Sequence, residues 1–160
     1  MEMTNDDAMR GLYLCFRVST GEYGIEINYV TEIIEYQDIT HVPNTHNYVT
    51  GIINMRGTIV PVIDMCSRFN QGSVEITDRT CIVVLTMDDV DLGLIVDEVQ
   101  EVLTINDSKI QPPPKSSAST GYSNEFIRAI GTPEPDKDGN ISIKQLLDIN
   151  KIFEVDEALQ

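Results

Sequence analysis

The chain has 160 residues, 41% of them hydrophobic, which suits one compact domain or two small subdomains with a true core. Its 26 acidic and 11 basic side chains give a net charge of −15, which disfavours nucleic-acid and membrane-surface partners by repulsion. No apolar run approaches the ~20 residues of a membrane helix, and the acidic start MEMTNDDAM is unlike a signal peptide. We therefore expect a cytoplasmic protein whose three cysteines, Cys15, Cys66 and Cys81, are reduced and largely buried.

The first elements along the chain are predicted strands. Leu12–Val18 alternates between apolar and polar residues, as a half-buried strand does, and Tyr23–Ile27 forms a second strand after the polar turn Ser19–Glu22. From Asn28, a possible helix cap, the spacing changes to that of a short helical segment with three apolar residues on one face: Val30, Ile33 and Ile34.

The sequence contains an internal repeat. Leu12–Ile34 aligns without gaps onto Cys81–Leu103, at an offset of 69 residues. Later stretches continue the pairing at growing offsets: Tyr48–Ile52 with Phe126–Ile130, and Ile63–Phe69 with Leu147–Phe153. The order of the matches predicts two similar β-rich units, each large enough for a small barrel of about five strands.

These units are placed at roughly residues 11–75 and 76–153, with polar tails at 1–10 and 154–160. Two longer loops in the second unit account for the growing offset. Gln111–Gly121 is rich in proline and small polar residues, and Thr132–Asn140 is built around a turn at Asp138-Gly139. Because no linker separates the units, we expect two barrels that share one interface.

The most distinctive stretch is GIINMRGTIVPVIDM, residues Gly51–Met65. Two apolar segments flank Arg56-Gly57, where Gly57 can supply the positive φ of a tight turn. Pro61 indicates that Ile59–Ile63 is an edge strand or carries a bulge.

This stretch resembles the hallmark of CheW-like domains, an Asn-Leu-Arg-Gly turn followed by Pro-Val-x-Asp-Leu. The resemblance extends from about Leu12 to Phe153, with Met55 in place of the usual leucine and Ala129 in place of the usual glycine. It implies an all-β fold of two small five-stranded SH3-like barrels with short helical segments. It also implies a monomeric, non-enzymatic adaptor without a cofactor, which holds the histidine kinase CheA against the cytoplasmic tips of chemoreceptors.

The same resemblance implies two sets of contact residues. Those facing the kinase's homologous regulatory domain are Leu14, Ile27, Val30 and Ile33, and those facing the receptor are Glu32, Asn54, Arg56, Gly57 and Val102. Apolar residues on strands are commonly core, so we expect two of the first set, Ile27 and Val30, to serve the interface. The family pairs the counterparts of Glu32 and Arg56, and this pair can be a structural clamp, a partner contact or both.

Several other patterns receive simpler interpretations. Glu134–Gln145 spaces its acidic residues like a calcium loop, but Gln145 cannot supply the bidentate carboxylate, so calcium is not expected. His41 and His46 are assigned to a surface turn, and Asp64 and Asp148 to helix capping. No known catalytic motif is present. The alternative function is a β-barrel that binds a small ligand or calcium through the loops of the second unit.

Overall fold

The computed structural model describes residues 10–42, 49–69, 71–115 and 125–157. Within them the chain is mostly β-strand, with two short α-helices and two 3₁₀ turns, as the sequence predicts. The elements of the first half are β1 (Leu12–Val18), β2 (Gly21–Glu26), η1 (Ile27–Tyr29), β3 (Val30–Glu35), β4 (Val49–Met55), β5 (Thr58–Asp64) and α2 (Met65–Arg68). Those of the second half are β6 (Cys81–Met87), β7 (Val90–Val96), β8 (Glu98–Thr104), η2 (Asp107–Lys109), β9 (Ile110–Gln111), β10 (Ile127–Gly131), β11 (Lys144–Leu147) and α3 (Ile149–Glu157).

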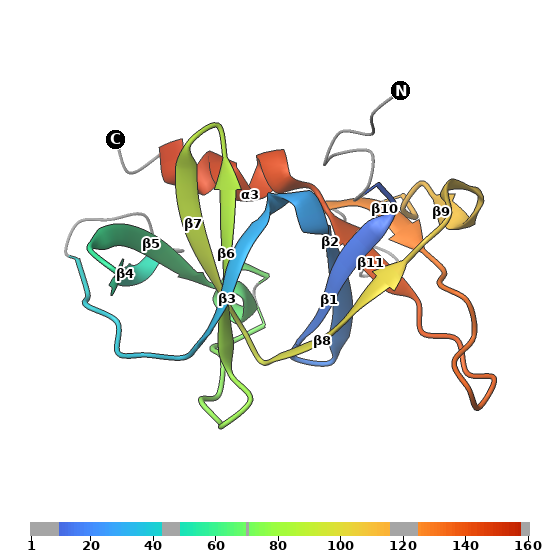
Figure 1. Ribbon diagram of the computed structural model, residues 1–160, viewed down its shortest axis with the longest axis horizontal. Helices are drawn as coiled ribbons and strands as arrows, with labels where there is room; N and C mark the ends of the chain where they lie inside the picture. The colour runs from blue at the N-terminus through green and yellow to red at the C-terminus, as the bar shows by residue number, and fades with distance from the viewer. Residues whose placement is uncertain (1–9, 43–48, 70, 116–124, 158–160) are drawn as a thin grey trace.

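The strands form two sheets, each the basis of one lobe (Figure 1). The first lobe is a five-stranded sheet in the order β3-β6-β7-β5-β4, and the second lobe is a six-stranded sheet in the order β8-β1-β2-β11-β10-β9. Helix α3 lies along the top of the view in Figure 1, across the junction between the lobes. No helix in the described ranges is long and apolar enough to cross a membrane.

The two sheets do not follow the two halves of the sequence. Each sheet takes an antiparallel pair from one half and its remaining strands from the other half: β6 and β7 join β3, β4 and β5, while β1 and β2 join β8 to β11. The predicted boundary near residue 75 therefore does not separate the lobes. The halves exchange strands. Each exchanged pair is held by an antiparallel ladder on one side, β3 with β6 and β1 with β8, and by a parallel ladder on the other, β5 with β7 and β2 with β11.

The internal repeat extends to the irregularities of the sheets. A β-bulge interrupts β3 against β6 between Val30 and Glu32, and another interrupts β8 against β1 between Val99 and Glu101, at the same aligned positions. The β4–β5 and β10–β11 ladders also shift register at matching places. Because a bulge bends a strand and increases its twist, the two sheets bend equivalent strands at equivalent places.

Two aligned glycines permit the parallel contacts between exchanged strands. A Cβ on Gly24 would lie 2.9 Å from Leu146 Cδ2, and a Cβ on Gly93 would lie 2.8 Å from Val62 Cγ1. Gly24 pairs with Leu146, and Gly93 with Val62, in their parallel ladders. Glycine at both places lets the large neighbour pack directly on the backbone.

The largest core cluster lies between the lobes and joins residues of both sheets and α3. Its fully buried members include Phe16, Ile63, Leu85, Leu94 and Ile152. Smaller clusters fill the first lobe, around Val62 and Val84, and the second lobe, around Tyr13 and Leu146. The expected interface between two units is therefore the principal core of the molecule.

Two local predictions need correction. Val30–Ile34 is not helical: after the single turn η1, which Asn28 does not cap, the chain continues as strand β3. The alternation of β3 is broken by its bulge at Thr31, and this produces the apparent helical spacing. The predicted C-terminal tail at 154–160 begins inside α3, which runs to Glu157. The predicted tail at 1–10 lies outside the described residues except for Arg10.

Strand β5 is not an edge strand, because it lies between β4 and β7. The pairing of β5 with β7 starts only at Val62, so Pro61 is paired with β4 alone. Because no strand lies on the β7 side of Pro61, its missing N–H removes no hydrogen bond of the β5–β7 ladder. The caps are confirmed: Asp64 accepts from the N–H groups of Cys66 and Ser67, and Asp148 from those of Asn150 and Lys151.

Candidate protein-binding site

The hallmark turn is the two-residue hairpin loop between β4 and β5. Arg56 and Gly57 both have positive φ, 50° and 89°, and Met55 pairs with Thr58 to close the hairpin. Two consecutive positive φ values are typical of a type I′ turn, whose twist matches that of the flanking strands. Asn54 Oδ1 accepts a hydrogen bond from Gly57 N at 2.8 Å, which holds the turn from inside. The sequence predicted the conformation of Gly57 but not that of Arg56.

The Arg56 side chain forms a two-point ion pair with Glu32. Nη1 donates to Glu32 Oε1 at 2.7 Å, and Nη2 donates to Oε2. Arg56 keeps 72% of its side chain exposed and Glu32 keeps 26%. The hydrogen bonds from Arg56 lower the pKa of the Glu32 carboxyl and raise the pKa of the guanidinium, so both groups stay charged.

This pair joins the two edges of the first-lobe sheet. Glu32 lies on the edge strand β3, and Arg56 lies at the end of the hairpin that contains the opposite edge strand β4. A bridge between Thr40 and Ile52 connects the same two regions. The sheet is therefore curled so that its edges meet, and a guanidinium is presented to solvent where they meet.

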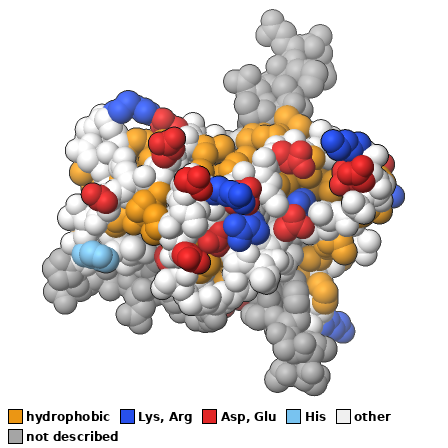
Figure 2. All heavy atoms as spheres, turned by 90° about the horizontal axis from the view of Figure 1, so that it is seen from below, with side chains coloured by type: hydrophobic (Ala, Val, Ile, Leu, Met, Phe, Trp, Pro, Cys, Tyr) orange, Lys and Arg blue, Asp and Glu red, His pale blue; other side chains and the backbone are white. Residues whose placement is uncertain are grey.

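Exposed apolar side chains accompany the ion pair in this lobe. Ile33, next to Glu32 on β3, is 42% exposed, and Ile59 follows the Arg56 turn on β5 and is also exposed. Ile59 was missed by sequence reasoning, although the alternation in TIVPVID places it on the opposite face from Val60 and Val62. Figure 2 shows hydrophobic groups exposed over both lobes, with charged side chains between them. Such surfaces are typical of protein docking.

The amino-acid sequence of residues 12–157 matches the CheW-like domain. The chain belongs to the family of CheW-like domains. It is 39% identical over 102 residues to the chemotaxis protein CheW of Bacillus subtilis (strain 168), an alignment that covers 64% of this chain and 65% of that protein, just under two thirds. It is 34% identical over 119 residues to the chemotaxis protein CheW of Klebsiella aerogenes, covering 74% of this chain and 70% of that protein.

The fold is also similar to a solved CheW structure. The scaffolding protein TtCheW from Thermoanaerobacter tengcongensis superimposes with a TM-score of 0.77 at 29% identity, covering 94% of this chain and 97% of that one. The CheW-like family consists of non-enzymatic scaffold and adaptor proteins. The prediction that this chain is not an enzyme is therefore confirmed.

The CheW-like resemblance implied four kinase contacts, which differ in their accessibility. Leu14 is 1% exposed and lies in the core between the lobes, so it has no surface to offer a partner and its assignment as a contact is corrected. Ile27 and Val30 are half-buried and pack against that same core. Ile33 is the most accessible of the four.

The implied receptor contacts fall into two places of the CheW-like fold. Glu32, Asn54, Arg56 and Gly57 gather at the hairpin of the first lobe through the contacts described above. Val102 is exposed on β8, an edge strand of the second lobe, opposite Leu14 in the ladder with β1. Sequence alignment within the repeat makes Val102 the counterpart of Ile33.

The loop with calcium-like spacing has a structural role. Asp136 Oδ1 accepts hydrogen bonds from the backbone N–H groups of Asp138 and Asn140, and Gly139 has a φ of 82° in the predicted turn. In the part of the chain that the structure describes, no three metal-binding side chains gather. His41 lies there in a loop, whereas His46 and most of Gln111–Gly121 fall outside the described residues.

Proposed function

We propose that this protein is a cytoplasmic adaptor of chemotaxis signalling that couples the histidine kinase CheA to the cytoplasmic tips of chemoreceptors. Its relatives carry the names chemotaxis protein CheW and scaffolding protein. The observation that carries the proposal is the hallmark hairpin, where the Arg56–Glu32 pair holds a charged group at the surface of a lobe that also exposes Ile33 and Ile59. A surface of this kind suits reversible protein recognition.

In this proposal the receptor binds at the hairpin. Asn54 and Gly57 fix the turn, and Arg56 presents its guanidinium in an orientation set by Glu32. A guanidinium that keeps free N–H donors can bind a carboxylate or carbonyl of a partner helix. Val102 would belong to a second contact on the other lobe.

The kinase contact is proposed along η1 and the start of β3, from Ile27 through Val30 to Ile33. Ile27 and Val30 provide half-buried apolar surface, and Ile33 provides the exposed apolar side chain that a partner would cover. Neighbouring residues of a strand point to opposite faces, so Ile33 and Glu32 can serve different partners.

The experiment that tests the function is calorimetric titration with the regulatory domain of CheA, followed by reconstitution with receptor and kinase. We expect binding to the domain, and kinase activity that responds to receptor ligand only when this chain is present. Ile33→Glu should weaken binding to the domain by about tenfold or more, because a carboxylate would be buried unpaired. Ile141→Glu, the same change at an exposed isoleucine of the second lobe, is the control. Absence of binding to both CheA and receptor would contradict the proposal.

A further inference from the structure

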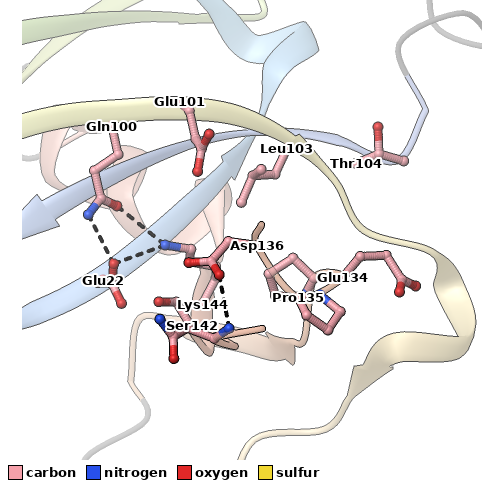
Figure 3. A pocket seen from close by; sticks show the side chains of 12 residues that line it. Glu22, Gln100, Glu101, Leu103, Thr104, Glu134, Pro135, Asp136, Ser142 and Lys144 are labelled. Atoms are coloured by element: carbon pink, nitrogen blue, oxygen red, sulfur yellow. Dashed lines mark hydrogen bonds and ion pairs between the residues drawn. The ribbon is translucent and has the colours of Figure 1, made fainter. Parts of the chain in front are cut away.

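The second lobe has a cleft at the place that corresponds to the ion pair of the first lobe. Its volume is about 380 Å³, and it lies between strand β8 and the segment 132–143, which connects β10 to β11, together with Lys144 at the start of β11 (Figure 3). Side chains from both sides line it, among them Gln100, Glu101, Leu103, Pro135 and Lys144. In the first lobe the corresponding elements, β3 and the β4–β5 hairpin, are joined by Glu32 and Arg56.

Glu101 is the counterpart of Glu32 in the repeat. Glu32 pairs with Val84 immediately after the bulge in β3, and Glu101 pairs with Cys15 immediately after the matching bulge in β8. Glu101 is exposed and lines the cleft (Figure 3), and within the described residues its side chain forms no hydrogen bond or ion pair. The first lobe therefore has a carboxylate with a guanidinium, and the second lobe has the same carboxylate without one.

Within the described ranges, no side chain supplies the missing cation. Residues 132–143 replace the tight Arg56-Gly57 turn, and this longer loop projects away from the lobe at the lower right of Figure 1. Its one basic residue, Lys137, stands in the turn at the loop tip, where Gly139 N donates to Asp136 O. No arginine of the second unit occupies the place that Arg56 has in the first.

The charges around the cleft favour a cation. Glu22, Glu101, Glu134 and Asp136 contribute carboxylates, and Lys144 is the one cationic side chain of the lining. Lys144 is already engaged, because its Nζ donates to Glu22 Oε1 at 3.0 Å and to Gln100 Oε1 at 3.4 Å, and its side chain is 4% exposed. Among the residues that the structure describes, Glu101 and Glu134 have no positive partner.

The lining suits an arginine side chain better than a metal ion. Leu103, Pro133 and Pro135 give the cleft apolar walls against which the methylene stem and the flat face of a guanidinium can pack. A metal ion would need several oxygen ligands converging on one point, and no such group forms in the described ranges.

We propose that this cleft binds an arginine side chain of a partner protein, with Glu101 holding the guanidinium as Glu32 holds Arg56. The partner thereby completes in the second lobe the ion pair that the first lobe makes within its own chain. The inference does not depend on whether the partner is a kinase, a receptor or another protein, and its test needs none of them.

The test is a nuclear magnetic resonance titration of the full chain with the peptide acetyl-Ala-Arg-Ala-amide. The control peptide carries citrulline, which has the shape of arginine without its charge. We expect the arginine peptide to shift the backbone amide signals of Gln100, Glu101 and Ser142, and the citrulline peptide to leave them in place. Glu101→Gln should weaken the binding of the arginine peptide by about threefold or more. Glu35→Gln, an equal change of charge on the exposed side of β3, should not.

Three outcomes would overturn the proposal. They are an absence of shifts at the cleft, equal shifts with the citrulline peptide, and unchanged affinity in Glu101→Gln. Each leaves the adaptor function untouched, because that function is tested by binding to CheA and receptor. A shift pattern centred on Glu32 would instead mean that the peptide competes with Arg56 in the first lobe.

Discussion

Lys144 and Glu22 form an ion pair across two strands that come from different halves of the chain, β11 and β2. The Nζ–Oε1 distance is 3.0 Å, and the lysine side chain is almost completely buried. Its counterpart in the repeat is Val60, which is fully buried in the apolar cluster of the first lobe. One position thus holds a charge in one lobe and a hydrocarbon in the other.

The pair predicts unequal effects of removing either partner. Glu22→Ala leaves a buried ammonium with only Gln100, and we expect the free energy of unfolding to fall by about 2 kcal/mol. Lys144→Met replaces the ammonium by an apolar side chain of similar length, as Val60 already does, and should change stability by less than about 1 kcal/mol. Urea unfolding measures both. A larger loss in Lys144→Met than in Glu22→Ala would contradict this interpretation.

Acidification should weaken the fold through the same carboxyl group. Hydrogen bonds from Gln100 and Lys144 lower the pKa of Glu22 below its usual 4.5. A group whose pKa is lower in the folded than in the unfolded state stabilises the fold above its unfolded pKa, and this contribution is lost as the pH falls through the folded value. We expect Glu22→Gln to reduce the loss of stability between about pH 5 and pH 3. An unchanged pH profile in urea unfolding would exclude this role, with Glu35→Gln as the control.

The glycines at the strand exchange should not tolerate a side chain. Gly24→Ala and Gly93→Ala each place a Cβ within 3.0 Å of a buried neighbour, and we expect each to cost about 1–3 kcal/mol. In a double variant with Leu146→Ala, Gly24→Ala should cost less than it does alone, because the contacting Cδ2 is removed. Strictly additive losses would show that the close approach is not the cause.

Arg56→Ala is expected to separate function from stability. The guanidinium is largely exposed, so the melting temperature should fall by less than about 5 °C. The variant should nevertheless fail to support receptor-controlled CheA activity in the reconstituted system. Circular dichroism and the kinase assay measure the two effects. A folded variant with normal receptor control of the kinase would remove Arg56 from the proposed receptor contact.

Glu32 provides the complementary test of that hairpin. If Glu32 acts by orienting Arg56, the double variant Glu32→Ala/Arg56→Ala should lose no more receptor control than Arg56→Ala alone. Additive losses would mean that the two side chains contact the receptor independently.

The three thiols should differ in their reaction with a maleimide. Burial raises the pKa of Cys15 to about 11, and burial together with the nearby Asp97 carboxylate raises the pKa of Cys66 to about 12. Both are therefore protonated at neutral pH, and the thiolate is the reactive form. Cys81 is partly exposed, although its pKa is also raised by burial. Mass spectrometry at pH 7 should find Cys81 labelled first. Rapid labelling of Cys15, which lies on the face of β1 opposite Leu14 and Phe16, would mean that the second lobe opens.

The amino-acid sequence by itself determined the strands, the repeat and the hallmark turn. Alternation identified β1 and β2, the offset of 69 residues identified their counterparts β6 and β7, and Asp64 and Asp148 were correctly read as caps. These features depend on neighbours within a few residues or on similarity between two stretches of chain. Both can be seen in a sequence without knowing how the chain folds back.

The tertiary structure alone decided how the strands combine. A repeat in a sequence is equally compatible with two independent barrels and with two sheets that exchange strands, because local periodicity says nothing about which partner completes a sheet. In the exchange, Leu146 packs onto Gly24 and Val62 packs onto Gly93. Even Val62 and Gly93, the pair closer together in sequence, are more than thirty residues apart. The tertiary structure also decided the conformation of β3. Its pairing with β6, through the bulge at Thr31, makes a strand of a segment whose apolar residues have helix-like spacing. The same long-range pairing buried Leu14 in the core that residues of both sheets form. It also placed β8 and β11 in one sheet, with β1 and β2 between them, so that Glu101 faces the loop 132–143, which has no arginine where the first lobe has Arg56.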